Sequence, residues 1–467
     1  MKEKLSFLSN KLGYSVGAVG LDLSYGMFYT YLSKYLTDVL LMPAAFLLII
    51  SAVARIWDGI NDPMMGTIVD NTNTKMGKYR PWIMRGTISN AVVLFLLFTN
   101  VFHFSGVALY IYVAVMYVAW GMTNTMADIP FWSMIPSFTN DPEERNLVST
   151  MTRVFSGLGQ GIVTIFAPII MLKFSRATAP DTGERVYDSR GFMLWTIICA
   201  VCLVGFGLIC VGKTKENNVV KAPEKFSFGK AFNIVKSNDQ LITFMLFAML
   251  SNAGWYLTSG VSTYFFENVV GDASKQSAFG LFGGIGSTVG IIVLPILTKF
   301  TSKRRTYQIS LITCIIGYIA MFISAKADML MLLNIFYVIT SIGMSTMFVA
   351  QTIFLADIVD YGEIKMGFRA ESITFSMKGF LQKMAYTLQT VILYSGLWAS
   401  GYDGQLKSAI SQGSKTTITV MMLLLPALLF ALSFIVFTSR FKLHGEFMDN
   451  VTQQIYERRD AKNTIED

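Results

Sequence analysis

Long apolar stretches, separated by short polar and basic segments, recur along almost the whole of this 467-residue chain. A transmembrane α-helix needs roughly 20 mostly apolar residues in a row, whereas the strands of an outer-membrane barrel alternate apolar and polar residues. Charged residues make up 15% of the chain, against about 25% in a typical soluble domain. The pattern therefore predicts an all-α membrane protein that crosses the bilayer many times.

Comparing the apolar stretches with their charged interruptions predicts twelve transmembrane helices in two sets of six. The longest hydrophilic interruption separates the two sets. We therefore expect an N-terminal six-helix bundle at 1–213, a central cytoplasmic loop at 214–237, a C-terminal six-helix bundle at 238–440 and a cytoplasmic tail at 441–467. The predicted helices cover residues 12–40, 44–70, 81–103, 106–137, 147–174, 190–213, 238–268, 276–299, 305–326, 328–356, 370–400 and 413–440.

Basic residues cluster in alternate loops between the predicted helices. Lys75 and Arg80 follow the second helix, Lys299 and Arg304 follow the eighth, and the central loop is also basic. Under the positive-inside rule these loops lie in the cytoplasm, which places both chain termini there. The loop at 173–190 is basic too and argues against this orientation, but it is outnumbered. We expect a multi-pass protein of the bacterial cytoplasmic (inner) membrane.

The two halves of the chain carry matching basic residues at one offset of 224 (299 − 75, 304 − 80 and 369 − 145). Parallel six-helix repeats are typical of the major facilitator superfamily, whose substrate site lies near the membrane midplane between the halves. We therefore predict that fold. The intramembrane carboxylates all lie in the first half, with uncharged residues at the matching positions of the second, so we expect any cation site in the N-terminal bundle. These carboxylates are Asp22, Asp58, Asp62 and Asp128.

Asp58 and Asp62 lie four residues apart in an apolar stretch, so they share one face of a helix. Carboxylates inside a bilayer are costly and usually mark an ion or proton site. Together with a hydroxyl such as that of Thr125, they offer a hard monovalent cation the oxygen ligands it prefers. Two such close acids would equally share one proton. Na⁺, Li⁺ and H⁺ are therefore all open as the coupling ion.

Structural ion pairing is the alternative interpretation of the buried charges, because four intramembrane cations balance the four carboxylates. Arg55 is the strongest structural member, since it lies three residues before Asp58 and is able to pair with it on the same helix. The other three cations are Arg153, Lys378 and Lys383.

Asp128 and Trp132 lie one helical turn apart in the fourth predicted helix. A sugar site needs acceptors for hydroxyl groups beside a flat apolar surface for the C–H face of the ring, and this pair offers both. Asp22 and Arg153 would supply further hydrogen bonds. Taken alone, Trp132 fits an interfacial or core position. The neighbouring carboxylate favours the sugar-binding interpretation.

A basic turn at Gly77–Pro81 follows the second predicted helix. We predict that its charges pair with the other half of the protein in one state of a transport cycle and so act as a gate. An ordinary solvated charged loop is the alternative. The gating residues that we expect are Arg80, Arg145, Asp357, Asp360 and Arg369.

The histidines and cysteines show no catalytic or metal-binding pattern. The chain has only two histidines, His103 in a loop and His444 in the tail, and its four cysteines lie in apolar stretches. We therefore expect no enzymatic activity, no cofactor and no metal site other than a monovalent cation at Asp58 and Asp62. The net charge of +8 reflects the basic loops of a membrane protein, so we expect no nucleic-acid partner.

Five segments together resemble the glycoside–pentoside–hexuronide:cation symporter family and, within it, the bacterial melibiose:cation symporters. They span both halves of the chain, and the sequences ARIWD-x-IND-P and DIVDYGE are the most specific of them. A general facilitator would show only the basic turn. The matching segments are Tyr14–Gly26, Ala54–Gly66, Met76–Trp82, Gly121–Ser133 and Asp357–Ser372.

The resemblance implies a secondary active symporter that imports a galactoside-like glycoside of the melibiose type, coupled to Na⁺, Li⁺ or H⁺ by alternating access. We expect a monomer whose partners are the glycoside, a monovalent cation and the lipid bilayer. The resemblance places the cation ligands at Asp58, Asp62 and Thr125, the sugar-contacting residues at Asp22, Asp128, Trp132 and Arg153, and the lysine that links the two sites at Lys383.

The sequence departs from the melibiose pattern at the edges of the pocket. Leu21 stands in place of a basic residue, Asn124 in place of an aromatic one, Phe348 in place of a tryptophan and Lys378-Gly379 in place of a Gln-Thr pair. Lys378 either faces the carboxylate of a uronide or reaches toward solvent. The alternatives are therefore a symporter of the same fold for a glucuronide or another pentoside or hexoside, a lysolipid carrier, and a sugar sensor without transport.

Overall fold

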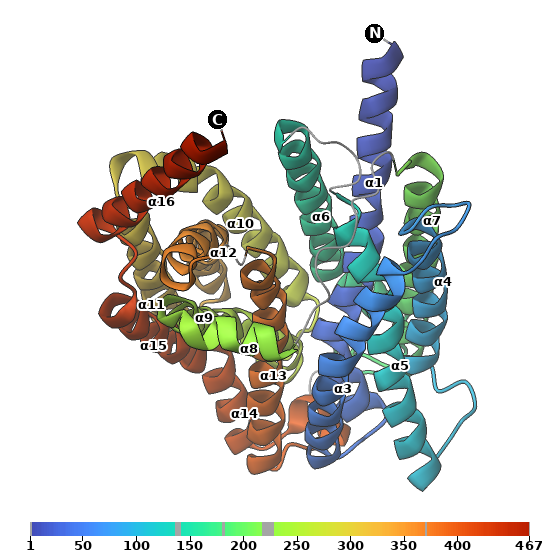
Figure 1. The fold of residues 1–467 in the computed structure, drawn as a ribbon. Coiled ribbons are helices and arrows are strands. Elements are labelled where there is room, and N and C mark those ends of the chain that lie inside the picture. Colours follow the sequence, from blue (N-terminus) through green and yellow to red (C-terminus); the bar gives the residue numbers. More distant parts are fainter. Residues whose placement is uncertain (1, 136–141, 180–182, 217–227, 369–370, 467) are drawn as a thin grey trace. The chain divides into compact units, whose positions relative to one another are not determined.

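The chain is almost wholly helical over the residues that the computed structural model describes, which are 2–135, 142–179, 183–216, 228–368 and 371–466 (Figure 1). Within these ranges the only strand-like pairings are two isolated bridges, between Thr74 and Gly77 and between Thr178 and Arg185. The predicted all-α fold is confirmed. Nine helices of the described ranges are long and apolar enough to cross a membrane.

The first six predicted transmembrane helices coincide with helical elements of the structure. The first of them is interrupted by π-helical turns, which often occur at functional sites. The elements are α1 (Lys2–Gly26), η1 (Met27–Tyr31), α2 (Leu32–Lys34), η2 (Tyr35–Val39), α3 (Ala44–Asp70), α4 (Arg80–Leu97), α5 (Gly106–Ser133), α6 (Pro142–Phe174) and α7 (Ser189–Lys213).

The second six predicted helices also coincide with helical elements. Two segments expected to be a loop and a tail contain helices of their own, α8 and α16. The elements are α8 (Phe228–Ser237), α9 (Asp239–Tyr264), η4 (Phe265–Val269), α10 (Lys275–Phe300), α11 (Lys303–Lys326), α12 (Leu330–Met366), α13 (Glu371–Ala399), η5 (Gly404–Ala409), α14 (Gln412–Thr419), η6 (Val420–Leu424), α15 (Leu425–Arg440) and α16 (Gly445–Glu466).

Helices α1 and α12 differ most from the prediction: α1 begins at Lys2 and not at residue 12, and α12 is longer at its end. The predicted end at residue 356 is wrong, because the helix continues through Asp357 and Asp360 to Met366. It ends at Gly367, whose φ of +82° is a left-handed conformation that favours glycine. The acidic segment therefore prolongs a helix. The charged residues lower the hydropathy of this segment, but the backbone hydrogen bonds of the helix continue through it.

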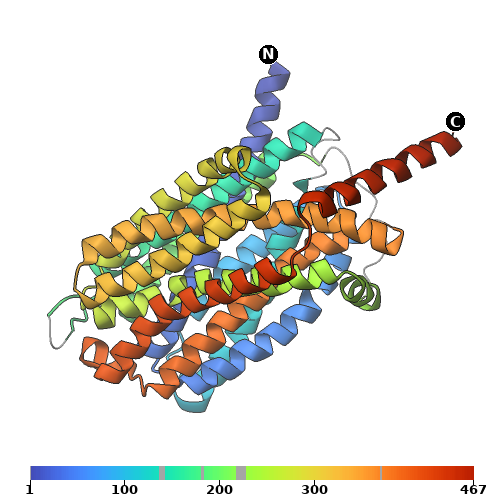
Figure 2. The same cartoon turned by 90° about the vertical axis from the view of Figure 1, so that its left-hand side faces the viewer.

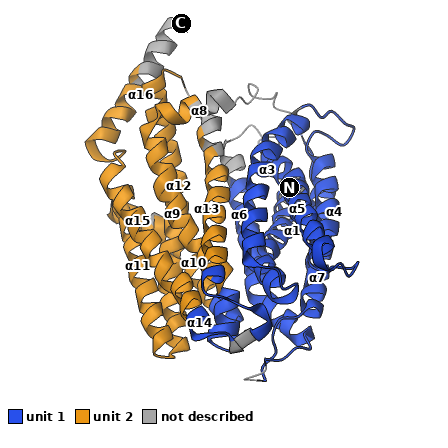
Figure 3. Cartoon of the chain, turned by 90° about the horizontal axis from the view of Figure 1, so that it is seen from below, with its two compact units in different colours: residues 1–225, 262–280, 397–415 blue, residues 226–261, 281–396, 416–467 orange. Residues whose placement is uncertain are grey.

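Two compact units make up the chain (Figure 3). The first unit contains residues 1–225 together with 262–280 and 397–415, and the second contains 226–261, 281–396 and 416–467. The first unit thus includes two segments from the second half of the sequence. The predicted division at 213, 237 and 440 stays a prediction.

Close helix packing in the first unit positions the polar residues described below. Helix α1 packs against α6 and α7, and α5 packs against α3 and α4. A Cβ atom on Gly86 of α4 would lie 2.5 Å from the backbone nitrogen of Ala127 on α5. Only glycine permits this approach, which is how small residues bring membrane helices together. Ala127 directly precedes Asp128, so this close contact fixes the position of the Asp128 residue along the axis of α5.

The chain ends in the polar helix α16, which packs against α12 within the second unit (Figure 2). The rings of Phe447 and Tyr361 lie 6.0 Å apart at this contact. The predicted tail therefore begins with an ordered helix that is attached to its own unit.

Candidate functional site

Asp58 and Asp62, two of the three acidic residues of α3, face α5. Asp62 accepts a hydrogen bond of 3.0 Å from the hydroxyl of Thr125. A Cβ atom on Gly121 would lie 3.2 Å from Oδ1 of Asp58. Both pairs of residues, 58 with 62 and 121 with 125, are separated by one helical turn, so the two helices run in register here. The structure thereby brings together the three predicted cation ligands.

Arg55 lies beside the same carboxylates. Its guanidinium forms an ion pair of 2.9 Å with Asp58, and both side chains are 11% exposed. This is the i+3 pairing that the sequence predicts. Arg55 therefore supplies the positive charge that offsets Asp58 in this structure, while Asp62 keeps its contact with the hydroxyl of Thr125.

A second polar group surrounds Trp132. Its indole nitrogen donates a hydrogen bond of 2.9 Å to Asp128, which lies one turn earlier on α5. The guanidinium carbon of Arg153, on α6, lies 4.2 Å from the centre of the indole ring. This distance is typical of a cation–π interaction. Trp132 therefore contacts two of the other three predicted sugar-binding residues of the first unit, Asp128 and Arg153.

Asp22 lies where α1 meets α6. The side chain of Ser156, on α6, lies near its carboxylate. A Cβ atom on Gly159 would lie 2.9 Å from Cβ of Asp22, so the two helices approach closely at this point. Asp22 thus occupies the α1–α6 contact, and Arg153 comes from the same α6 helix.

Tyr25 and Tyr29 also lie in this region, but they were not predicted from the sequence as site residues. Tyr25 accepts a hydrogen bond of 2.9 Å from the side-chain amide of Asn124, and its ring stacks on Tyr29 at 5.5 Å. Among residues 21–30, only Asp22, Tyr25 and Tyr29 are partly exposed. Their spacing of three and then four residues is one helix face, so this pattern was available in the sequence.

The remaining predicted sugar and coupling residues lie in the second unit, on α13. Lys378 donates a hydrogen bond to the hydroxyl of Thr352, and its ammonium group lies 4.9 Å from the ring centre of Phe348. Trp255 packs edge-on against Phe348, with 5.3 Å between ring centres. Lys383 lies five residues further along α13 and is half-buried. The structure therefore places Lys378 beside an aromatic pair.

Two of the predicted gating residues, Arg80 and Asp357, have partners within their own units. Backbone N–H groups of Lys78, Tyr79 and Arg80 donate to the carboxylate of Glu216, at 2.6, 3.0 and 3.0 Å. In the second unit, Lys303 forms an ion pair of 3.0 Å with Asp357. Asp360 lies one turn further along α12. The side chain of Arg145 and all of Arg369 lie outside the described residues.

Arg80 and Arg304 make equivalent contacts, as expected of a repeat. Arg80 donates a hydrogen bond of 2.9 Å to the backbone oxygen of Val211, at the end of α7. Arg304 donates one of 2.7 Å to the backbone oxygen of Thr438, at the end of α15. In each half, the arginine that follows the second helix thus contacts the last turn of the sixth.

Replacement of Glu216 by alanine is expected to destabilise the protein by about 1–2 kcal/mol, because three donors at the start of α4 lose their acceptor. Thermal unfolding of the purified protein in detergent measures this effect. Lys215→Ala is the matched control, since Lys215 is exposed beside Glu216. Equal melting temperatures for the two variants would contradict a structural role for Glu216.

Known proteins are similar to this chain over almost its whole length. The profile of the family described as MFS/sugar transport protein matches residues 13–445. The lactose permease of Leuconostoc lactis is 26% identical over an alignment of 491 positions, gaps included, which covers 99% of this chain and 75% of that protein. The glucuronide carrier protein homolog of Escherichia coli (strain K12) is 24% identical over 424 residues, 90% of each chain.

Solved structures agree with this assignment at the level of the fold. A crystal structure of the nucleoside transporter NupG superposes with a TM-score of 0.65 at 14% identity, covering 93% of this chain and 100% of that chain. At this identity the similarity concerns the fold alone.

Proposed function

Because this chain belongs to the MFS/sugar transport protein family, we propose that it imports a galactoside-like glycoside together with a monovalent cation. The protein is a multi-pass membrane transporter of the sugar-symporter type and not an enzyme. The galactoside, the cation and a cytoplasmic location of both termini belong to the proposal. The lactose permease among the relatives supports a galactoside.

The observation that carries the proposal is that α5 contributes to both polar groups. Thr125 donates to Asp62, and Asp128, three residues later, accepts from Trp132. Residues three apart lie on neighbouring positions of one helix face. A cation held at Asp58, Asp62 and Thr125 would therefore act on the same turn of helix that orients the sugar-binding carboxylate.

This arrangement supports coupling without covalent chemistry. A cation would neutralise the α3 carboxylates and draw the Thr125 oxygen toward itself, which stabilises the turn that carries Asp128. A sugar bound at Asp128 and Trp132 would stabilise the same turn in return. By linkage, each ligand then raises the affinity for the other by the same factor. We propose Lys383 as the lysine that links the cation site to the sugar site.

Reconstituted protein tests the proposal by counterflow. Liposomes loaded with unlabelled galactoside are expected to accumulate the labelled sugar faster when Na⁺, Li⁺ or an acidic external pH is supplied. Comparison of the three conditions identifies the coupling ion. Protein-free liposomes and the Asp128→Asn variant are the controls. Accumulation of no glycoside under any condition would overturn the proposal and favour a sensor or a lipid carrier.

A glucuronide is the second candidate substrate, and the position of Lys378 favours it. The ammonium group lies against Phe348, whose ring packs edge-on against Trp255, a setting that suits a ring bearing a carboxylate. A glucuronide carrier protein homolog is among the relatives. An ion pair or charge-assisted hydrogen bond from Lys378 would then select acidic sugars.

Replacement of Lys378 by glutamine separates the two substrates. The variant should bind a neutral galactoside about as well as the parent protein. It should lose roughly tenfold or more in affinity for a uronide if a charge-assisted hydrogen bond is removed. Competition binding with one sugar of each class measures both. A selective loss of the acidic sugar assigns the protein as a uronide symporter; equal affinities leave the galactoside as the substrate.

A further inference from the structure

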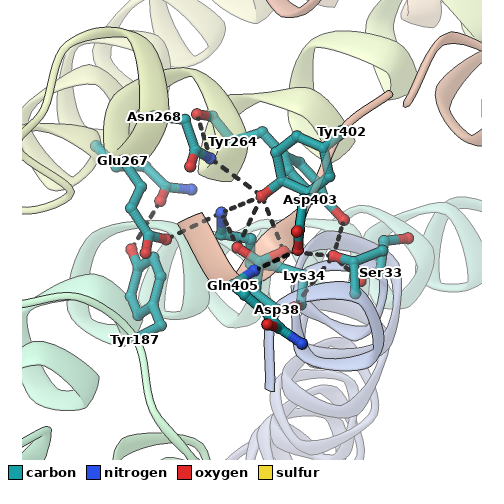
Figure 4. A network of polar contacts seen from close by, with 12 residues as sticks. Ser33, Lys34, Asp38, Tyr187, Tyr264, Glu267, Asn268, Tyr402, Asp403 and Gln405 are labelled. Atoms are coloured by element: carbon teal, nitrogen blue, oxygen red, sulfur yellow. Dashed lines mark hydrogen bonds and ion pairs between the residues drawn. The ribbon is translucent and has the colours of Figure 1, made fainter. Parts of the chain in front are cut away.

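A second buried ion cluster lies in the first unit, apart from the residues discussed above (Figure 4). The ammonium group of Lys34 is 2.6 Å from Asp38 and 3.1 Å from Glu267, and the three side chains are 0–1% exposed. The hydroxyl of Tyr402 donates to Asp38 at 2.8 Å and accepts from Lys34 at 3.3 Å. These four residues are called the Lys34 cluster below.

The Lys34 cluster joins segments that are far apart in the sequence. Lys34 and Asp38 belong to α2 and η2 in the first half of the chain. Glu267 belongs to η4, and Tyr402 precedes η5, both in the second half. A Cβ atom on Gly404 of η5 would lie 2.5 Å from the backbone oxygen of Thr37. The halves therefore meet here backbone against backbone, as well as through side chains.

Aromatic and polar side chains complete the contact between the halves. The ammonium group of Lys34 lies 4.6 Å from the ring centre of Tyr264, and the hydroxyls of Thr37 and Tyr264 are 2.9 Å apart. The side-chain amide of Asn268 lies 3.4 Å from the hydroxyl of Tyr402. The cluster is thus a continuous network from the first half to the second, not an isolated pair.

The predicted topology assigns the cluster to the outer end of the protein. The segments 40–43, 270–274 and 400–411 connect the first helix to the second, the seventh to the eighth and the eleventh to the twelfth. With both termini in the cytoplasm, all three connections face the opposite side of the membrane. The Lys34 cluster lies next to each of them.

We infer that the Lys34 cluster is a latch that closes the outer end of the transport pathway and separates in each cycle. Alternating access requires the halves to part at this end when it opens. Buried charges are held by their partners, yet water solvates them well once they are exposed. A latch of charged residues is therefore held together by its ion pairs when it is closed, and hydration of the charges offsets the free energy needed to open it. The inference rests on the transporter function but not on the identity of the sugar.

Removal of the cation provides the first test. Lys34→Met leaves the carboxylates of Asp38 and Glu267 buried without their shared ammonium group, which penalises the closed state. The probe is a cysteine introduced at Ser33, which is 7% exposed. In intact cells, we expect a membrane-impermeant maleimide to label the cysteine at position 33 roughly tenfold faster in the double variant Ser33→Cys/Lys34→Met than in Ser33→Cys alone. The protein without the Ser33→Cys substitution gives the background.

A steric change provides the second test, independent of charge. Gly404→Ala places a methyl group against the backbone of Thr37 and should also speed labelling of the Ser33→Cys probe. Gly413→Ala is the matched control, because its Cβ would meet nothing closer than 3.7 Å. Cys210 is fully buried near the predicted cytoplasmic end of α7, so a membrane-permeant maleimide applied in parallel reports unfolding through it. Cys210 should stay unlabelled in every variant.

The outcomes separate clearly. Faster labelling in Lys34→Met and Gly404→Ala, with Gly413→Ala and Cys210 unchanged, supports the latch. Unchanged labelling in both variants, or faster labelling only from the cytoplasmic side of inside-out vesicles, overturns it. Labelling of Cys210 along with the probe also overturns it, because the substitution would then have loosened the whole unit. The assay contains no sugar, so failure of the glycoside counterflow assay has no bearing on this result.

Discussion

Replacement of Asp62 by cysteine is expected to abolish the stimulation of sugar binding by cations. Asp62 is hydrogen-bonded to Thr125 at 3.0 Å, and its carboxylate has no substitute among uncharged side chains as a ligand for a hard cation. Binding of a labelled galactoside with and without Na⁺ or Li⁺ measures the effect. Thr125→Ala should weaken the stimulation less, because a water molecule can replace a hydroxyl ligand.

Thr67→Ala is the control for this experiment, since Thr67 lies on the same helix, is exposed, and its hydroxyl bonds to the backbone oxygen of Pro63. Normal stimulation of sugar binding by cations in Asp62→Cys would show that Asp62 is not a ligand of the cation. A drop in expression alone would favour the structural ion-pair interpretation.

Asp58 needs a different design because of its ion pair with Arg55. Asp58→Asn alone leaves a buried guanidinium without its countercharge, which destabilises the protein whatever the role of Asp58. The double variant Arg55→Gln/Asp58→Asn removes both charges and should restore folding. We expect it to remain insensitive to cations. Recovery of cation stimulation in the double variant would show that Asp58 has a structural role only.

Replacement of Asp128 by asparagine is expected to lower sugar affinity by roughly ten- to a hundredfold or more. The carboxylate would make charge-assisted hydrogen bonds to sugar hydroxyls, worth about 1.5–3 kcal/mol. Asparagine retains an oxygen that Trp132 is able to contact, so the indole should stay in place. Asp22→Asn should show a loss of the same order. Isothermal titration at saturating cation measures both variants, with Glu446→Gln on the tail helix as the control.

Trp132→Ala extends the test from charge to shape. The indole would contact the ring face of the sugar and not its substituent, so its loss should weaken sugars with every aglycone to a similar degree. Selective loss of one aglycone would move Trp132 to the edge of the pocket. Normal binding of all sugars by Asp128→Asn would show that the sugar site lies elsewhere.

Some of the candidate site was predictable because it depends on short spacings along one helix. The i+3 pair of Arg55 with Asp58 and the i+4 pair of Asp128 with Trp132 are both present in the structure. Lys34 and Asp38 have the same i+4 spacing inside the first predicted helix but were not predicted as site residues. Their separation was visible; their burial was not. Glu267 lies inside the seventh predicted helix, so the expectation that all intramembrane carboxylates belong to the first half is wrong.

The positions of the helices could be predicted from the sequence, because the thickness of the bilayer requires long apolar segments and the basic loops interrupt them. The carboxylates that share a helix face could be predicted in the same way. The partners that these charges contact became known from the folded structure alone. Glu216 reaches the turn at Lys78, and Glu267 reaches Lys34. Such contacts join residues more than a hundred positions apart, and helix periodicity contains no information about them, since it describes one helix at a time.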